Sequence, residues 1–508
     1  MTTATGPHRN LVLAAMIFAV AMTFIDQTIV SIAVPNIQRE LSLSATGVQW
    51  VVNGYLLSLA ALFALGGRLS DIFGHRRMCV LGVIIFTAAS ALCGLTPKGG
   101  AAEGWIVAFR VLQGAGGALM FPAALAIVVR TFPLHERGKA LAIFFGIAGG
   151  LTAIGPILGG YLTQWTWRAI FWVNIPVAVI ALVLTFMAMP ENEPVPARID
   201  YRGALLVAVG IGLSIFGLQQ SALWGWRNGG TWACIIGGLL VIAIFVRFEM
   251  GTAAPLIDVK IFRIRAFAVE NVVLFIAMMV FIPVFFFASE YAQISLRKTA
   301  SESGLFLLYF FIGFAVAAQI GGRILDREGA KRPVVMGSAL AAVGFGLWAS
   351  KVTHLTLSGQ IVWIIVAGAG MGMMLGPANT DAINRASNLS YGEATGVTQT
   401  VRNYGASLGL AVLGTLLLTV QRSKLTMSLK AQGVAHAAKV AATFSQSQGG
   451  HAVSSIPRYV SSDFAYATQS VLYAMCGIMG FAGLVALVAL TRGVQEISPE
   501  DATGALTG

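Results

Sequence analysis

Charged residues are scarce in this sequence. Only 11% of its 508 residues are Asp, Glu, Lys or Arg, whereas a soluble domain contains about 25%. Hydrophobic residues make up 57% of the chain, and the mean hydropathy is +0.79. A chain this long and this apolar cannot hide its hydrophobic surface in a soluble fold. Composition therefore excludes a soluble protein and predicts an all-α integral membrane protein.

The sequence also lacks the motifs of catalysis and of cofactor binding. It has only four cysteines, which stand apart in apolar runs without the spacing of disulfide frameworks or zinc sites. These are Cys79, Cys93, Cys234 and Cys476. We find no Walker loop, nucleophile elbow or zinc-binding motif. We therefore expect no enzyme, no ATP-driven pump, and neither a metal nor another cofactor.

Positive charge is in excess, with a net charge of +12. The basic residues lie in short loops between apolar runs rather than in one patch, which excludes nucleic acid as a partner. Nothing in the sequence indicates an obligate protein partner. The first apolar run is too long for the core of a cleaved signal peptide, so we expect it to remain as a membrane span.

Apolar runs of bilayer-spanning length dominate the chain. A spanning helix needs about 20 apolar residues. Roughly fourteen runs meet this requirement, namely 11–34, 47–67, 78–95, 105–129, 139–162, 169–189, 203–221, 231–248, 267–289, 303–322, 333–350, 359–380, 395–419 and 468–490. An even number places both termini on one side. The short loops on that side carry more Lys and Arg, which predicts cytoplasmic N- and C-termini.

One motif occurs twice. GGRLSDIFGHRR (66–77) returns as GGRILDREGAKR (321–332), with the glycines, the aspartate, the first arginine and the last arginine in register. Two parallel repeats predict a transporter of two six-helix bundles, with two helices left over. The Pro-rich stretch 190–203 is typical of a linker. We expect a first bundle over 1–189, a linker with two extra spans over 190–266, a second bundle over 267–492 with a long outer loop over 421–467, and a cytoplasmic tail over 493–508.

Two charges inside the spans do not follow the repeat. Asp26 lies in the first span, and a charge at the centre of a membrane helix costs about 2.5–3.5 kcal/mol on insertion scales. Arg110 lies in the fourth span. At about 1.5 Å per residue, both fall about 5–10 Å to the outer side of the midplane, where an arginine side chain could bridge them. The pair is either a structural ion pair or a protonatable carboxylate tuned by a cation.

Five motifs in order resemble those of the fourteen-helix drug:proton antiporters of the major facilitator superfamily, a bacterial multidrug efflux branch. DQTIVSIAVPNI (26–37) resembles the first-helix motif D-x-T-I-V-N-V-A-L-P-x-I, and residues 67–77 resemble the loop motif G-x-L-x-D-R-x-G-R-R/K-x. FRVLQGAGGA (109–118) resembles the fourth-helix motif R-x-x-Q-G-x-G. GPILGG (155–160) resembles the antiporter motif G-P-x-x-G-G, and WRAIFWVNIPV (167–177) resembles the stretch that follows it.

The resemblance implies alternating access in the bacterial inner membrane, with proton entry driving export. It assigns proton coupling to Asp26 and Arg110, and gating to Asp71 with the surrounding loop residues Gly67, Gly74, Arg76 and Arg77. It implies that Gly155, Pro156, Gly159 and Gly160 allow the fifth helix to pack closely and bend between the bundles. The loop departs from the family pattern at Ile72 and His75, where arginine is usual.

Five further residues are weaker candidates for substrate or proton handling. Glu270 and Glu290 lie near opposite ends of the ninth span, where each is either interfacial or functional. Arg402, about two turns into the thirteenth span, either bonds neighbouring helices or acts with substrate. Phe281 and Tyr309 belong to aromatic runs that either line a lipophilic cavity or face lipid.

The sequence thus predicts an exporter of small lipophilic or amphipathic compounds that works in the bilayer with protons as its coupling ion. One alternative is a proton symporter that imports a nutrient or an anion. The other is a membrane receptor or enzyme that moves nothing. The antiporter-like GPILGG argues against the first, and the set of transport motifs argues against the second.

Overall fold

The computed structural model describes residues 6–132, 134–188, 200–252, 255–256, 259–385, 391–447, 457–491 and 493. These residues form helices joined by short connections, and none of them lies in a strand. The helices are α1 Gly6–Leu41, α2 Ala45–Phe73, α3 His75–Gly94, α4 Ala102–Thr131, α5 Leu134–Trp165, α6 Ala169–Trp172, α7 Asn174–Ala188, α8 Tyr201–Trp224, α9 Gly229–Glu249, η1 Val259–Arg263, α10 Arg265–Ile294, α11 Ala300–Glu328, α12 Lys331–Val352, α13 Ile361–Asn384, α14 Tyr391–Ala431, α15 Ala437–Ser447 and α16 Arg458–Ala489.

The predicted spans all coincide with helices. In the described part of the chain, 13 helices are long and apolar enough to cross a membrane, with α6 and α7 together forming one of them. The 32-residue α5 occupies the place of the remaining predicted span. The expected all-α membrane fold with about fourteen spans is therefore confirmed.

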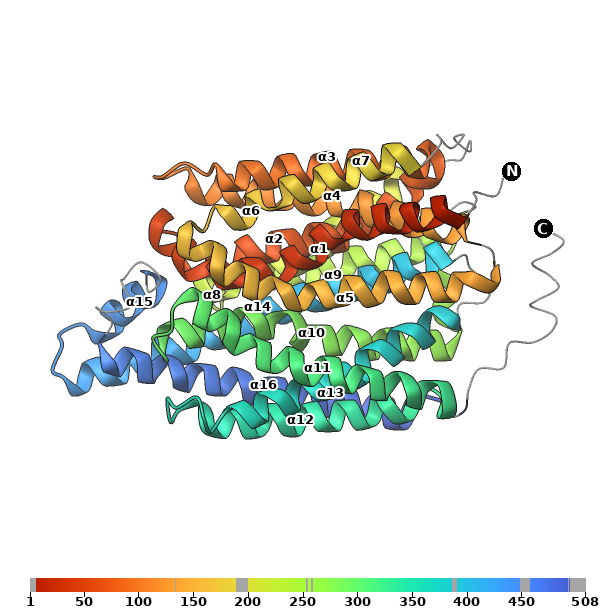
Figure 1. Ribbon diagram of the computed structural model, residues 1–508. Helices are drawn as coiled ribbons and strands as arrows, with labels where there is room; N and C mark the ends of the chain where they lie inside the picture. Colours follow the sequence, from red (N-terminus) through yellow and green to blue (C-terminus); the bar gives the residue numbers. More distant parts are fainter. Residues whose placement is uncertain are drawn as a thin grey trace.

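The long helices run side by side, as Figure 1 shows. α1 begins and α16 ends at the same end of the molecule, which we call the termini side; the opposite end is the far side. Within the first bundle, α4 packs on α2 and α3, and α1 packs on α5 and α7. Within the second, α13 packs on α11 and α12, α16 packs on α12, and α14 packs on α10.

The two bundles meet through α1, α2 and α5 of the first and α10, α11 and α14 of the second. Glycine allows a close approach on the far side, where Gly160 of α5 lies against the main chain of Ser301 in α11. The Gln293 side chain of α10 reaches across and donates to the Ile32 carbonyl of α1 at 2.9 Å. The far-side halves of the bundles are therefore in contact.

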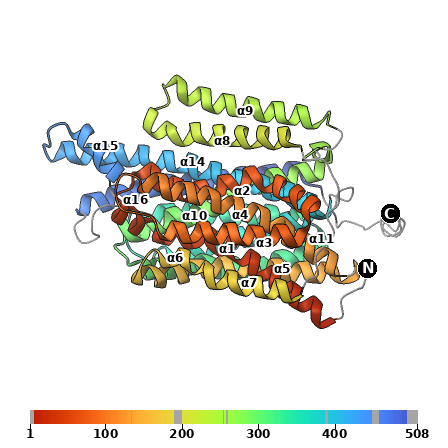
Figure 2. The same ribbon diagram turned by 90° about the horizontal axis from the view of Figure 1, so that it is seen from above.

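The two helices left over from the bundles form a separate hairpin. α9 packs on α8, and α8 packs on α2 and α14, so the hairpin covers one edge of the junction between the bundles (Figure 2). Asp200 caps α8 by accepting from the Gly203 amide at 2.9 Å, and Asn228 caps α9 by accepting from the Gly230 amide at 2.8 Å.

The structure differs from the sequence prediction in 421–467, which we expected to be a loop. α14 continues through Ala431, α15 follows, and α16 already begins at Arg458. The hydropathy falls near residue 419 because the helix leaves the apolar region there. Most of the residues that follow are nevertheless good helix formers, up to Gly433, whose φ is +75°. α15 and the end of α14 project together on the far side of the molecule (Figure 1).

Candidate functional site

An ion pair lies inside the first bundle. Arg110 of α4 donates from Nη1 to Oδ2 of Asp26 in α1 at 2.5 Å. Gln113, one turn further along α4, donates from Nε2 to Asp26 Oδ1 at 2.9 Å and accepts from Arg110 Nη1 at 2.8 Å. Both oxygens of the carboxylate thus have a donor, and the three side chains bond to one another in a closed triangle.

Two further helices hold the guanidinium in place. Arg110 Nε donates to the Val51 carbonyl of α2 at 2.7 Å. The guanidinium lies over the Tyr55 ring of α2 at 4.5 Å and near the Phe171 ring of α6 at 5.9 Å, distances at which cation–π attraction operates. The Tyr55 hydroxyl donates to the Thr23 carbonyl of α1 at 3.2 Å, which connects this ring back to the helix of Asp26.

The pair is withdrawn from solvent, with Asp26 1% and Arg110 0% exposed. Removing one partner of such a buried pair costs about 3–5 kcal/mol, because the other charge stays buried without compensation. Arg110 and Gln113 of α4 compensate the negative charge of Asp26. A proton on Asp26 would remove that charge. The geometry can therefore link the protonation of one side chain to the packing of α1 against α2 and α4.

Asp26 and Arg110 were expected at matching depths, and the structure brings them into contact. Sequence reasoning did not single out Gln113 or Tyr55. Gln113 could have been identified from the sequence, because a residue three positions after Arg110 lies on the same helix face. Tyr55 carried no such signal, since it comes from another helix.

The loop between α2 and α3 lies on the termini side. Gly74 ends α2 with a φ of +96°, a left-handed conformation that favours glycine, and the chain turns directly into α3. Asp71, about half exposed, has its Oδ1 3.8 Å from Nε2 of His75. His75 Nδ1 in turn lies 3.1 Å from the Ser70 hydroxyl. The departure from the family pattern at His75 thus supplies a neighbour for Asp71.

The other residues of this loop motif have separate environments. The Arg76 guanidinium lies 5.2 Å from the centre of the Phe186 ring in α7, and the Arg77 side chain is exposed. A Cβ on Gly67 would stand 3.6 Å from Pro122 of α4, which is ordinary contact. Among these residues, Gly74 has the strictest conformational need for glycine.

The antiporter-like motif of α5 lies between two helices. A Cβ on Gly155 would overlap the Thr28 hydroxyl of α1, and one on Gly159 would stand 2.9 Å from Ile29. Gly160 faces the other way, where its Cβ would stand 2.7 Å from the Ser301 Cα of α11. The carbonyl of Pro156 lies against Gly304 of α11. The motif is where α5 packs tightly on both bundles.

The acidic candidates of α10 are both buried. Glu270 is 0% exposed, and its carboxyl interacts with Asp381 of α13 and with Arg385, the residue directly after α13. Glu290, toward the far side, is 8% exposed, and no described residue donates a hydrogen bond to it. Burial inside the protein differs from the interfacial location that we held open for each of them.

Arg402 lies on α14 between α10 and α13. It donates from Nη1 to Asn379 Oδ1 at 3.2 Å, and its Nη2 lies 3.9 Å from the Met278 sulfur. Its Nε is buried without a described partner. No carboxylate among the described residues pairs with this guanidinium, so it is a cation compensated only by neutral groups.

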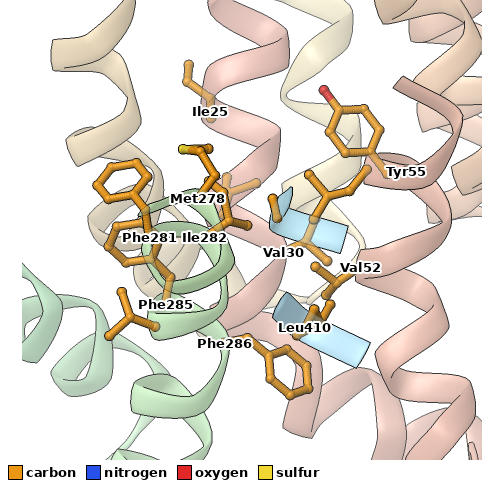
Figure 3. Packing of buried hydrophobic residues seen from close by; sticks show 14 of the residues in the cluster. Ile25, Val30, Val52, Tyr55, Met278, Phe281, Ile282, Phe285, Phe286 and Leu410 are labelled. Atoms are coloured by element: carbon orange, nitrogen blue, oxygen red, sulfur yellow. The ribbon is translucent and has the colours of Figure 1, made fainter. Parts of the chain in front are cut away.

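The aromatic candidates lie on α10 and α11. Phe281 is 7% exposed and its ring contacts those of Phe285 at 5.2 Å and Phe314 at 5.4 Å. Figure 3 shows the side chains of α10, including Phe281, next to apolar residues of the first bundle such as Val30. Tyr309 is partly buried against the same core. The apolar surface at the junction of the bundles is thus rich in aromatic rings.

Comparison with known proteins adds a family and several relatives. The model of the Major Facilitator Superfamily matches residues 16–410. The tetracenomycin C resistance and export protein of Streptomyces glaucescens is 35% identical over 411 residues, which is 80% of this chain and 75% of that protein. The multidrug resistance protein Stp of Mycobacterium tuberculosis is 30% identical over 410 residues, with the same shares. The cephamycin export protein CmcT of Amycolatopsis lactamdurans is 31% identical over 402 residues, or 77% of this chain and 81% of that one.

Solved structures agree on the fold. A bacterial homolog of the human lysosomal transporter Spinster, inward-facing and unoccupied, superposes with a TM-score of 0.62 at 16% identity over 96% of this chain and 98% of its own. A D-xylose-proton symporter gives a TM-score of 0.62 at 13% identity over 95% and 98%. At such low identity these likenesses concern architecture alone.

Proposed function

Because this chain belongs to the Major Facilitator Superfamily, we propose that it is a secondary transporter that exports small lipophilic or amphipathic compounds in exchange for protons. Named relatives at 30–35% identity are export or resistance proteins, which supports export over import. A transporter of this family is not an enzyme.

The buried contact between Asp26 and Arg110 carries the proposal. It is an ionisable pair inside a membrane protein, where ionisable groups commonly mark ion pathways. It occurs in one bundle only, so the shared scaffold of the repeat does not require it. Its carboxylate accepts from two side chains of α4, so protonation would change the contact of α1 with α4.

The cycle follows from this link. In the outward-facing state Asp26 takes a proton from the outer aqueous phase. In the inward-facing state substrate enters from the cytoplasm or the inner leaflet, and Asp26 releases its proton to the cytoplasm while Arg110 and Gln113 again compensate the carboxylate. Alternation of the two states moves protons inward and substrate outward.

We infer the orientation from charge. The termini side carries the more basic short loops, which supports cytoplasmic termini and a bacterial inner-membrane location. The domain limits proposed from the sequence, 1–189, 190–266 and 267–492, are supported by the grouping of helix contacts and by the outer position of the α8–α9 hairpin. The tail proposed over 493–508 lies, beyond residue 493, outside the described residues.

Gating is proposed for the two glycine-bearing motifs. Asp71 with His75, Arg76 and Arg77 would close the cytoplasmic side through polar contacts at the loop after α2. Gly155, Pro156, Gly159 and Gly160 of α5 would let the bundles approach closely on the far side and separate again. The tight contact of Gly160 with α11 supports this assignment.

The substrate path is proposed to pass the aromatic surface at the bundle junction. Phe281, with Tyr309 near it, would contact apolar parts of the substrate, and Arg402 would attract polar or acidic groups because its charge has no described carboxylate partner. Glu290 is proposed to contact substrate from the far-side part of α10.

The test uses purified protein in liposomes with a pH dye inside and an imposed pH gradient. A panel of lipophilic cations, acids and neutral compounds is added in turn to the wild type, Asp26→Asn and Asp200→Asn. Asp200→Asn makes the same chemical change at the N-cap of α8, where Asn caps as well as Asp. Export predicts substrate-triggered proton movement that only Asp26→Asn abolishes. Movement of substrate and protons in the same direction would instead establish a symporter.

A further inference from the structure

A second pair of ionisable groups lies in the second bundle, separate from the Asp26–Arg110 ion pair of the first bundle. Glu270 of α10 and Asp381 of α13 are 0% and 5% exposed, and their carboxyl groups interact with each other. Both oxygens of Glu270 are buried, and neither accepts a hydrogen bond from any described residue. Two buried acids that interact with each other, one of them without a described hydrogen-bond donor, require an additional positive charge.

One cation is present, but it serves the other acid. Arg385 donates from Nε to Asp381 Oδ2 at 2.6 Å, one helical turn along α13. The positive charge of Arg385 also attracts the Glu270 carboxyl, but Arg385 donates no hydrogen bond to it. With both acids ionised, this group of three side chains would hold one uncompensated negative charge inside the protein.

The remaining cations nearby do not supply the missing charge. Arg263 of η1 and Arg265 at the start of α10 are exposed. Arg402 is nearer in depth: Gly405 and Gly409 of α14 pack on the carbonyls of Phe275 and Met279 of α10, so residue 400 is level with Glu270.

The Arg402 guanidinium, however, is directed toward Asn379 and Met278 rather than toward Glu270. Other polar atoms around this level are also buried without a described partner. They are the amide oxygen of Asn271 and the hydroxyls of Thr398 and Thr400. The surroundings of Glu270 are therefore polar and supply no hydrogen bond from a cation among the described residues.

A single proton resolves this arrangement. Ionisation of one buried carboxyl group disfavours ionisation of a second that interacts with it, whereas one protonated acid donates a hydrogen bond to the other. We propose that Glu270 and Asp381 share one proton and form a second proton-binding site, on the termini side of the second bundle. The proton is taken from water and returned to water, and no bond other than O–H forms or breaks.

The shared proton does not depend on the proposed export, but its part in transport does. If the site exchanges its proton during the cycle, the exporter moves protons bound at two places, Asp26 in the first bundle and the Glu270–Asp381 pair in the second. Coupled export still requires Asp26, so Asp26→Asn abolishes it even though the Glu270–Asp381 pair still binds its proton.

Infrared difference spectroscopy of the purified protein in bilayers tests the site without transport. The wild type at neutral pH is compared with Glu270→Gln and Asp381→Asn, and with Glu302→Gln as control, since Gln also completes the capping box at the exposed Glu302. We expect Glu270→Gln and Asp381→Asn each to remove or shift one C=O band of a protonated acid. Glu302→Gln should remove only carboxylate absorbance. Gel filtration verifies that each variant is folded, and the side-chain amide introduced by Glu270→Gln can still donate to Asp381.

Two results would overturn the proposal. In the first, the folded Glu270→Gln variant loses only carboxylate absorbance, which would mean that Glu270 is ionised in the wild type. In the other, sodium added to the wild type shifts a carboxylate band that is absent in Glu270→Gln, so that the occupant is a metal cation. The same spectra in the Asp26→Asn background keep this test separate from export, because the Glu270 band should persist there even if no compound is transported.

Discussion

Gly304 of α11 packs directly on the main-chain carbonyl of Pro156 in α5, where the two bundles meet on the far side. A Cβ at position 304 would overlap this oxygen, and backbone atoms cannot yield as the end of a flexible side chain can. Closure of the far side in this conformation therefore requires glycine at position 304.

Gly304→Val should disfavour the conformation in which α5 touches α11. We expect the neighbouring Ser301→Cys to react severalfold faster with a membrane-impermeant maleimide applied from the far side. Gly322→Val on the same helix is the control, because nothing lies within 4 Å of its Cβ position. Equal labelling rates in folded Gly304→Val and Gly322→Val would contradict this interpretation of the contact.

Gln113→Leu should destabilise the first bundle because Asp26 Oδ1 would lose its donor inside the protein. A buried acceptor left without a partner costs about 1–3 kcal/mol. The measurement is the free energy of unfolding in detergent for Gln113→Leu, Asp26→Asn and the double variant. The effects should be non-additive, since both residues belong to one hydrogen-bonded group. Additive effects would show that the two side chains do not act together.

Tyr55 should stabilise Arg110 mainly through its ring. Tyr55→Phe loses the hydrogen bond to Thr23, about 0.5–1.5 kcal/mol, and keeps the aromatic face. Tyr55→Leu additionally loses a cation–π contact worth about 0.5–2 kcal/mol. Thermal unfolding should therefore rank the wild type above Tyr55→Phe and Tyr55→Phe above Tyr55→Leu. Equal stability of the two variants would mean that the ring contributes no attraction to the guanidinium.

Arg402→Gln should change substrate preference through charge. The guanidinium has no described carboxylate partner, so its removal should lower transport of acidic compounds and raise that of cations relative to neutral ones. Transport of a matched set of acidic, neutral and cationic compounds measures this ratio. The exposed Arg227→Gln provides the comparison for loss of one positive charge. The same ratio in both variants would exclude Arg402 from substrate contact.

The sequence predicted the spans and the Asp26–Arg110 contact because both depend on patterns along a single helix. Hydropathy fixes where a helix crosses the bilayer, and depth follows from counting residues along it. Two rare charges at one depth have few other partners, so their meeting could be expected before their geometry was known.

The acid pair in the second bundle was not predicted, for a physical reason. The span over 359–380 was expected to end before Asp381, but α13 continues to Asn384, so Asp381 belongs to the packed helix. Its contact with Glu270 depends on how α13 packs on α10, which a single-helix pattern does not contain. The helical extension of α14 beyond residue 420 was missed for a related reason, because hydropathy reports the membrane boundary and not the end of a helix.

The most direct test of the account compares two modes of transport by Asp26→Asn in liposomes. Exchange of labelled for unlabelled substrate across the membrane needs no net proton movement, whereas accumulation against a substrate gradient does. The account predicts that Asp26→Asn keeps exchange, which also verifies that it is folded, and loses accumulation driven by a pH gradient. Accumulation by Asp26→Asn with proton movement equal to that of the wild type would contradict the assignment of Asp26 as the proton-coupling residue.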